Sequence, residues 1–308
     1  MNKDKKFRIL SLDGGGIRGL YSAKILQKME EEFKIDFYND FDLIIGTSTG
    51  SILAGAIVKK IPLQVVISLY EHEGKKIFKK KFFSRIGLFQ SIYKPDYLKE
   101  RLKDIFKNTT LGQIEKPLII NATDVGNSTP FVFKTQHPKR ELVRDKDIAL
   151  YDAILASSSA PIYFPPHKVG DYLLADGGLW ANSPVLVALS EAIYSFDIKP
   201  ENISIVSIGT GVEKIEYDFN TKAWGFLTGW KKQKFISTIL NLQTISNQNL
   251  INFLVNENNI LRLSYESNAT LPLDDVSQNK NLLSKADHHF TYRYEEIKNF
   301  INKHIKEI

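Results

Sequence analysis

Residues 7–26 read FRILSLDGGGIRGLYSAKIL and hold the pattern that decides the fold. The apolar run Phe7–Leu12 is typical of a short buried strand, and the glycines of residues 13–19 mark a tight turn. Apolar residues then recur every four positions, which predicts a helix over Leu20–Phe33. A strand, a turn and a helix in this order favour an α/β protein.

The same alternation continues through the first two thirds of the chain. It predicts an α/β sheet covered by helices on both faces. The further strands are expected at Phe41–Ile45, Pro117–Ala122, Phe131–Lys134, Tyr172–Ala175 and Ile203–Ile208, and further helices at Ser51–Val58 and Val185–Tyr194.

After Gly211 the sequence becomes rich in Asn and Lys, with helical patterns over Phe235–Val255 and Tyr294–Ile308. We therefore expect one unit over residues 1–212 and a helical extension over residues 213–308, packed on the same domain. The asparagines inside the first of these helices are predicted to mark its solvent face: Asn241, Asn247 and Asn249.

Composition excludes several classes of protein. With 43% apolar and 25% charged residues among 308, the chain resembles a globular protein, and no apolar run approaches the length of a membrane-spanning helix. No secretory signal is recognised, which predicts a cytoplasmic protein and leaves export without a signal peptide open. The absence of cysteine excludes disulfides, cysteine catalysis and thiolate metal sites. The net charge, 41 − 35 = +6, favours anionic partners without choosing among them.

The glycine-rich turn, Asp13-Gly-Gly-Gly-Ile-Arg-Gly, has two chemical interpretations. Its glycines let a ligand approach the backbone, and the helix that follows offers unpaired N–H groups. The ligand is either a dinucleotide pyrophosphate, with Asp36 at about the expected distance, or the oxyanion of an acyl-transfer intermediate. The alternative is a tight turn that binds no ligand. Arg18 adds a positive charge that could steady either an oxyanion or a lipid phosphate. The dinucleotide pattern G-x-G-x-x-G is formed by Gly14, Gly16 and Gly19.

A second turn, Gly46-Thr-Ser-Thr-Gly50, also lies between a predicted strand and a predicted helix. This is the context of a nucleophile elbow, in which Ser48 is held in a strained conformation and Gly46 and Gly50 relieve clashes. The dipole of the following helix favours negative charge at the serine. The alternative is a helix start with small capping residues.

A serine nucleophile needs a base, which is commonly a histidine. None of the histidines has a persuasive setting, and the adjacent pair His288–His289 does not face together as metal ligands on a helix would. Asp176-Gly177-Gly178 instead follows a predicted strand directly, so its carboxylate is well placed to project into a site. The alternative is an ordinary Asp-Gly turn. The histidines are His72, His137, His167, His288, His289 and His304.

In combination these motifs resemble the patatin-like phospholipases, over roughly residues 7–212. The likeness is carried by Asp13-Gly-Gly-Gly-Ile-Arg-Gly19, Gly46-Thr-Ser-Thr-Gly50, Ala156-Ser-Ser-Ser-Ala-Pro-Ile-Tyr-Phe-Pro165 and Asp176-Gly-Gly178, in this order. It implies a three-layer α/β/α patatin-like fold with a mainly parallel central sheet and a C-terminal helical extension.

The resemblance further implies a lipid acyl hydrolase with a Ser48–Asp176 dyad and an oxyanion hole at Gly14, Gly15, Gly16 and Arg18. The supporting glycines are Gly19, Gly46, Gly50, Gly177 and Gly178; Gly178 stands where many members carry alanine. The implied substrate is a membrane phospholipid, and no cofactor, metal or nucleic-acid polymer is required. Some bacterial members are anti-phage effectors switched on by cyclic nucleotides, so a cyclic-nucleotide activator is a candidate partner.

Two basic, aromatic segments are candidates for contact with a peripheral membrane surface. Residues 75–94 carry seven Lys or Arg and no acid, and Trp224, Phe226, Leu227 and Trp230 precede Lys231 and Lys232. Each segment could equally pack against the core. The competing functions are a nucleotide-binding oxidoreductase, a non-catalytic membrane-binding protein, and, among enzymes, a protease or small-ester hydrolase.

Overall fold

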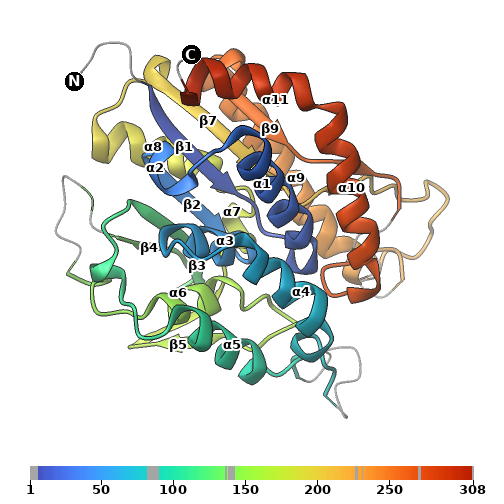
Figure 1. Cartoon of the computed structure of the whole chain (residues 1–308). Helices are drawn as coiled ribbons and strands as arrows, with labels where there is room; N and C mark the ends of the chain where they lie inside the picture. Colours follow the sequence, from blue (N-terminus) through green and yellow to red (C-terminus); the bar gives the residue numbers. More distant parts are fainter. Residues whose placement is uncertain are drawn as a thin grey trace.

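The computed structural model describes residues 6–81, 90–135, 137, 143–225, 228–230, 232–269 and 272–306. Within these ranges eight strands form one sheet: β1 (Phe7–Leu12), β2 (Leu43–Thr47), β3 (Leu118–Asp124), β4 (Thr129–Lys134), β5 (His167–Val169), β6 (Tyr172–Asp176), β7 (Ile203–Ile208) and β9 (Ile260–Leu263). Their order is β5-β6-β3-β2-β1-β7-β9, and β4 also pairs with β3 (Figure 1). A separate two-stranded ladder joins β8 (Val212–Glu213) to β10 (Glu266–Ser267).

The sheet is mainly parallel, as predicted. Strands β3, β2, β1, β7 and β9 run parallel to one another, whereas β4 and β6 pair antiparallel with β3, and β5 pairs antiparallel with β6. The carboxyl ends of β1 and β2 therefore lie together, with Leu12 in register with Gly46. This places the two glycine-containing turns next to each other at one edge of the sheet.

Helices cover both faces of the sheet, which gives the three layers (Figure 1). Successive side chains of a strand point to opposite faces. The described helices are α1 (Gly19–Phe33), α2 (Phe37–Asp40), α3 (Thr49–Val58), α4 (Leu63–Ile77), α5 (Asp96–Phe106), α6 (Leu150–Ser157), α7 (Gly178–Ala181), α8 (Val185–Phe196), α9 (Lys232–Leu254), α10 (Asn279–Tyr292) and α11 (Tyr294–Ile301). Leu10 and Leu12 therefore join the core under α1, α3 and α4, and Ile9 joins the core under α8 and the end of α9.

The region after residue 212 contributes more than helices. Its strand β9 pairs with β7 in the main sheet, and Arg262 on β9 forms a 2.5 Å ion pair with Asp13 at the end of β1. The four-residue run Ile260–Leu263 is too short for apolar periodicity to distinguish a strand from a helical segment. Only the pairing with β7 settles its conformation.

The predicted solvent face of α9 is wrong for two of its three asparagines. Asn241 donates to the carbonyl of Glu213 at 2.7 Å, and Asn247 donates to the carbonyl of Ser183 at 2.9 Å. Asn249 alone of the three is exposed. The prediction failed because side-chain amides can bind backbone carbonyl groups, so a polar residue does not always face water.

Candidate active site

Ser48 stands in a sharp turn between β2 and α3. Its backbone angles, φ 53° and ψ −123°, are rare for a residue with a side chain, and they mark a strained position. A Cβ atom on Gly46 would lie 2.3 Å from the carbonyl oxygen of Gly50, and one on Gly50 would lie 2.1 Å from that of Leu12. Glycine is therefore needed on both sides of the serine for the chain to turn this tightly.

The turn is held from a neighbouring helix. The N–H of Ser48 donates to Oγ of Ser157 at 2.8 Å, and this hydroxyl donates to the carbonyl of Asn121 at 2.6 Å. Ser157 ends α6 and Asn121 lies on β3, so three elements fix the position of one serine. Ser157 lies in the motif of residues 156–165, but the sequence alone does not predict this role for it.

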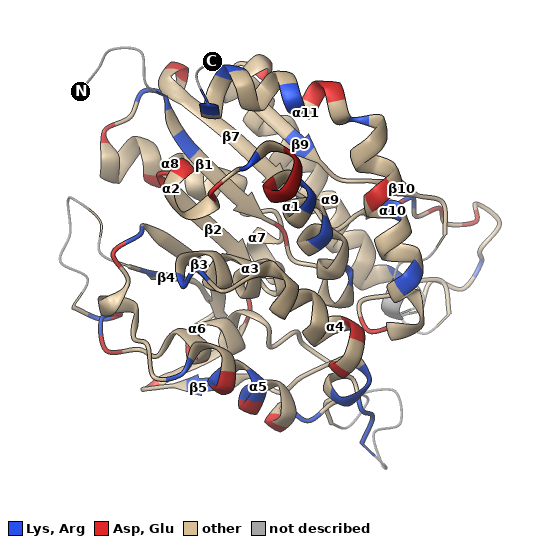
Figure 2. Ribbon diagram, viewed as in Figure 1, with Lys and Arg blue, Asp and Glu red and all other residues tan. Residues whose placement is uncertain are grey.

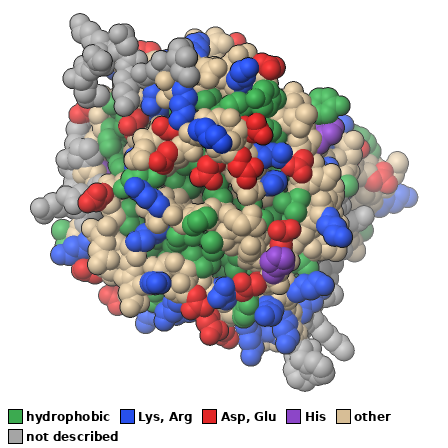
Figure 3. All heavy atoms as spheres, in the orientation of Figure 1, with side chains coloured by type: hydrophobic (Ala, Val, Ile, Leu, Met, Phe, Trp, Pro, Cys, Tyr) green, Lys and Arg blue, Asp and Glu red, His purple; other side chains and the backbone are tan. Residues whose placement is uncertain are grey.

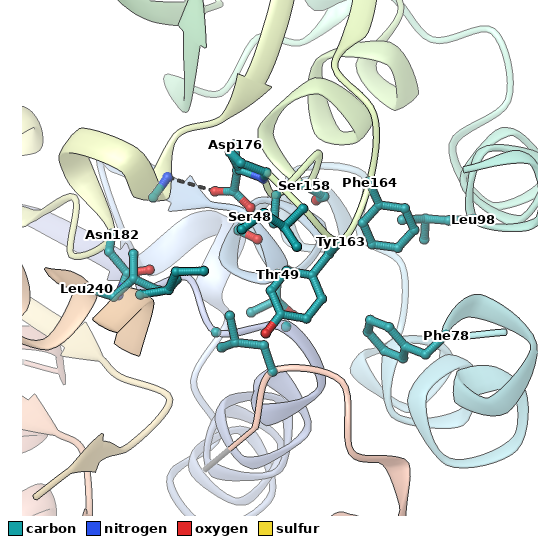
Figure 4. Close-up of a pocket in the computed structure, with 18 of the residues that line it drawn as sticks. Ser48, Thr49, Phe78, Leu98, Ser158, Tyr163, Phe164, Asp176, Asn182 and Leu240 are labelled. Atoms are coloured by element: carbon teal, nitrogen blue, oxygen red, sulfur yellow. Dashed lines mark hydrogen bonds between the residues drawn. The ribbon is translucent and has the colours of Figure 1, made fainter. Parts of the chain in front are cut away.

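Asp176 ends β6, where the strand lies in register with Ala122 of β3. Its Oδ1 accepts a 2.7 Å hydrogen bond from the N–H of Gly178, and the Ser48 side chain lies beside its carboxyl group (Figure 4). The side chains of Ser48 and Asp176 thus meet, although 128 positions separate them in the chain (176 − 48). Gly177 and Gly178 begin the short helix α7 beyond the carboxylate.

The environment of Asp176 makes its carboxylate more basic than a free one. Burial raises its pKa from 3.8 to about 6, against the smaller lowering effects of the hydrogen bonds from Gly178 and Ser48. At neutral pH such a group is ionised and still accepts a proton more readily than an exposed aspartate.

All six histidines lie in the described part of the chain, and none lines the pocket that contains Ser48. His167 is bound to Asp152 at 2.8 Å, and His137 is bound to Glu191 at 2.7 Å. A histidine relay to Ser48 is therefore absent from the described residues. The same residues contain no cluster of three His, Asp or Glu suited to a metal ion.

Some backbone N–H groups of the glycine-rich turn form hydrogen bonds within the fold, and others line the pocket. The N–H of Gly14 donates to the carbonyl of Asn182 at 2.9 Å, and that of Ile17 donates to the carbonyl of Leu273 at 2.9 Å. Gly15 and Gly16 line the pocket beside Ser48, and no hydrogen bond among the described residues uses their N–H groups. Of the predicted oxyanion-hole glycines, Gly15 and Gly16 have available donors, whereas that of Gly14 is already engaged.

Arg18 lies behind this turn rather than in the pocket. Its side chain is 5% exposed; Nε donates to the carbonyl of Gly15 at 3.2 Å, and a terminal nitrogen donates to the carbonyl of Gly211 at 3.5 Å. The guanidinium therefore orients the peptide that joins Gly15 to Gly16. Gly19 follows as the first residue of α1.

The pocket is lined mainly by apolar side chains. Figure 4 shows Asn182 and Leu240 on one side of Ser48 and Asp176, and Tyr163, Phe164, Leu98 and Phe78 on the other. The apolar lining is completed by Ile52, Tyr70, Ile77, Ala160, Pro161, Ile162, Leu179, Ile236 and Leu273. Ile236, Leu240 and Leu273 come from the region after residue 212, so that region helps to enclose the site.

Two polar residues of the pocket were missed in the sequence. Ser158 lines it with a buried hydroxyl that has no hydrogen-bond partner, and Asn182 lines it while its N–H donates to Gln243 at 2.6 Å. Ser158 lies inside the motif of residues 156–165, which was the available signal. Asn182 lies in the stretch Gly178-Leu-Trp-Ala-Asn-Ser-Pro184, which also resembles bacterial members of the family, but its contact with Gln243, 61 positions away, leaves no local pattern.

The structure does not place Asp36 where the dinucleotide interpretation needs an acidic residue. Asp36 caps α2, where its carboxylate accepts from the N–H groups of Tyr38 and Asn39 at 3.0 and 3.1 Å. It does not line the pocket at Gly15 and Gly16.

The two predicted membrane segments are described only in part. In the first, Phe82, Phe83, Arg85, Ile86, Leu88 and Phe89 lie outside the described residues. Exposed Lys75, Lys76, Lys79 and Lys80 gather around the end of α4, while Phe78 lines the pocket (Figure 2). In the second, Phe226, Leu227 and Lys231 lie outside the description, and Trp224 and Trp230 are 44% and 38% exposed. No described helix is both long enough and apolar enough to cross a bilayer.

Comparisons with known proteins agree with this geometry. The family model of the patatin-like phospholipases matches residues 10–189. A cGAMP-activated phospholipase of Escherichia coli strain TW11681 is 31% identical over 89% of this chain and 82% of its own length. Patatin-like protein 4 of Arabidopsis thaliana is 29% identical over 89% and 80%.

Among solved structures, VipD of Legionella pneumophila has a similar fold. It covers 94% of this chain and 67% of its own chain, with a TM-score of 0.50 at 12% identity. The residues matched by the family model include the glycine-rich turn, the elbow and the Asp-Gly-Gly motif. The chain belongs to the patatin-like phospholipase family and is a lipid acyl hydrolase.

Proposed function

We propose that this chain is a phospholipase A-type enzyme that cleaves fatty-acyl esters of membrane phospholipids, with Ser48 as nucleophile and Asp176 as its base. One observation carries the proposal. The Ser48 hydroxyl, the Asp176 carboxylate and the available N–H groups of Gly15 and Gly16 open into a single apolar pocket. An ester carbonyl placed there has a nucleophile, a base and two oxyanion donors within one site.

The reaction proceeds in two steps. The Ser48 hydroxyl gives its proton to Asp176 while Oγ attacks the ester carbonyl carbon, and the carbonyl oxygen becomes an oxyanion held by Gly15 and Gly16. The carbon–oxygen bond to the lysophospholipid breaks, and the departing alkoxide takes the proton from Asp176. Water then attacks the acyl-serine with Asp176 again accepting the proton; the fatty acid leaves and the proton returns to Ser48.

The base, the oxyanion donors and Arg18 each make a distinct contribution to the rate. A positioned base gives about 10²–10⁴-fold, and each oxyanion donor gives about 10²–10³-fold. Arg18 contributes as a positioning residue, because it holds the Gly15 carbonyl so that the Gly16 N–H points away from it. We expect Arg18→Gln to lower kcat more than it raises KM, since an acyl chain still fits the unchanged pocket.

The lining of the pocket supports an acyl-chain substrate. Its walls are aliphatic and aromatic side chains, which suit a fatty-acyl chain better than a peptide or a sugar. We place the enzyme in the cytoplasm at the surface of a membrane, because its substrate is a bilayer lipid. Neither a cofactor nor a metal is needed for the steps above.

The decisive measurement is fatty-acid release from mixed phospholipids by wild type, Ser48→Ala and Asp176→Asn. Both variants should lose at least about 10³-fold in kcat while their circular dichroism spectra stay unchanged. His167→Asn is the matched control, because His167 forms the kind of carboxylate pair a histidine relay would use, yet lies outside the pocket. Loss of activity in His167→Asn, or full activity in Asp176→Asn, would overturn the dyad.

We further propose that a cyclic nucleotide activates the enzyme as part of an anti-phage response. The support is the similarity to the Escherichia coli cGAMP-activated phospholipase over 89% of this chain. Adding cGAMP should raise fatty-acid release from vesicles well above the basal rate. A rate that is already maximal and does not change with cGAMP, cyclic di-AMP or cyclic UMP-AMP would contradict this part of the proposal and leave the dyad untouched.

A further inference from the structure

Helix α9 packs on the protein with its polar side. Gln243 accepts from the N–H of Asn182 at 2.6 Å, Thr244 accepts from the Asn182 side chain at 3.1 Å, and Gln248 donates to the Ser183 hydroxyl at 3.1 Å. These bonds add to those of Asn241 and Asn247 described above. Only at its C-terminal end does an apolar residue, Ile251, enter the core. A surface helix of a globular protein normally packs the other way.

The outward side of α9 is mainly apolar, although Ser246, Asn249 and Asn252 are also exposed. Phe253 is 85% exposed and Leu242 is 61% exposed. The other large apolar side chains exposed on this helix are Ile239 at 43%, Ile245 at 44%, Leu250 at 47% and Leu254 at 54%. Single exposed apolar residues are ordinary, but a row along one helix marks an interaction surface.

This apolar row is continuous with the mouth of the catalytic pocket. Ile236 and Leu240, on the neighbouring side of α9, line that pocket. Leu179 of α7 both lines the pocket and is 46% exposed, and its carbonyl accepts from Gln243 of α9 at 3.3 Å. Leu179, Ile236 and Leu240 therefore place apolar side chains between the outward side of α9 and the pocket that contains Ser48.

The charge and the aromatic content of the segment around α9 indicate which partner its outward side would bind. Residues 219–256 contain four lysines and no Asp or Glu. On the face seen in Figure 3, by contrast, basic and acidic side chains are interspersed. The half-exposed rings of Trp224 and Trp230 lie 5.3 Å apart, and Trp230 lies 5.3 Å from Phe235 in the first turns of α9. Tryptophan concentrates at the boundary between lipid and water, and lysine is attracted to anionic lipid headgroups.

We propose that α9, together with Trp224 and Trp230, is the surface by which the enzyme docks on an anionic phospholipid bilayer. The helix lies flat in the interface with Leu242 and Phe253 inserted among the acyl chains. A phospholipid then enters the pocket past Leu179 and Leu240. This inference rests on the proposed function for its substrate. A second copy of the chain is the less suitable occupant, because it would bring the same lysines against each other, whereas anionic lipid neutralises them.

Binding can be measured without turnover in the Ser48→Ala background. Large unilamellar vesicles of equimolar phosphatidylglycerol and phosphatidylethanolamine are used in a flotation assay. The pair Leu242→Asn and Phe253→Asn should reduce the apparent partition coefficient at least about tenfold, equivalent to about 1.4 kcal/mol. The matched control is Val143→Asn, because Val143 is 67% exposed outside α9; its binding should equal that of the parent.

The absence of cysteine allows a second, site-specific measurement. Leu242→Cys and Val143→Cys each create the single cysteine of the chain, which can carry an environment-sensitive fluorophore. On addition of the same vesicles, the probe at residue 242 should shift to the blue and become protected from an aqueous quencher. The probe at residue 143 should not change. Equal responses at both positions would overturn the proposal, even where the asparagine variants had disturbed folding.

The assay also separates this inference from the proposed function. Hydrolysis of a soluble short-chain ester should be unaltered by the Leu242 and Phe253 substitutions, while release of fatty acid from vesicles falls with binding. Equal loss on both substrates would show that α9 supports the active site instead of docking. A wild-type dimer that these substitutions convert to a monomer with unchanged vesicle binding would assign the surface to a second copy. A protein that binds vesicles through α9 but cleaves no ester would retain the docking surface and refute only the proposed activity.

Discussion

Replacing Asp176 by asparagine should make the protein more stable at pH 8 while abolishing its activity. The pKa of Asp176 rises from 3.8 in an unfolded chain to about 6 in the folded protein, chiefly because burial disfavours the charged carboxylate. Asparagine has the same shape and can keep the bond from the Gly178 N–H. It removes only the burial of a negative charge.

The size of the effect follows from proton linkage. Between pH 3.8 and 6 the folded state binds more protons than the unfolded state, so the free energy of unfolding of the wild type falls as pH rises. At about 1.36 kcal/mol per pKa unit, the full difference is about 3 kcal/mol at pH 8. It shrinks to less than about 1 kcal/mol at pH 4, where the carboxyl group is protonated in the folded state and only partly ionised in the unfolded state.

Urea unfolding of wild type and Asp176→Asn at pH 8, 6 and 4 measures this difference directly. Asp275→Asn is a control, because its effect on the free energy of unfolding should have the opposite sign. The N–H and hydroxyl of Ser277 hold the pKa of Asp275 below its ordinary value, so its charged form stabilises the fold above pH 4 and that contribution is lost as pH falls. An Asp176→Asn protein that is less stable than wild type at pH 8, or a difference that does not change with pH, would refute the argument that the carboxylate is desolvated.

Three further outcomes follow from the site. Hydrolysis of a soluble ester should be constant above pH 6 and fall about tenfold per pH unit below it, because the base acts only when ionised; a midpoint near pH 4 in kcat/KM would contradict this. Gly16→Ala should lower kcat about 10²–10³-fold, because Gly16 has φ +58° and its Cβ would lie 2.2 Å from the carbonyl oxygen of Leu273; activity within about twofold of wild type would mean that the turn is not the oxyanion hole. The free energy of unfolding of Ser48→Gly should exceed that of Ser48→Ala by about 1–3 kcal/mol, because glycine relieves the strain at φ 53°. Equal urea midpoints for the two variants would show that the elbow stores no strain.

The elbow and the glycine-rich turn could be predicted because each is local. A strand, a pair of flanking glycines and a helix lie within a few residues of Ser48, and steric clash requires the glycines whatever the rest of the fold does. The pairing of Ser48 with Asp176 could not be worked out in the same way. It depends on β6 lying antiparallel to β3, a contact between segments about 50 positions apart that leaves no local pattern.

Helix α9 shows where local reasoning fails. Its asparagines suggested an outward face, but the amides of Asn241 and Asn247 bind the backbone carbonyls of Glu213 and Ser183 instead. Hydrophobic patterning assumes that polar groups face water, and it cannot detect a partner supplied by another segment. The apolar row of α9, and with it the proposed docking surface, is visible only after that partner is known.

The sequence by itself determined the alternating α/β chain, the tight turns at residues 13–19 and 46–50, and the family to which the protein belongs. These depend on side-chain spacing and on the backbone freedom of glycine, both of which act over a few residues. The tertiary structure alone decided three features: which N–H groups of the first turn are available, how strongly burial raises the pKa of Asp176, and which side of α9 faces outward. Each of these depends on what distant segments bring to the same place, because desolvation and hydrogen-bond satisfaction are properties of the packed chain.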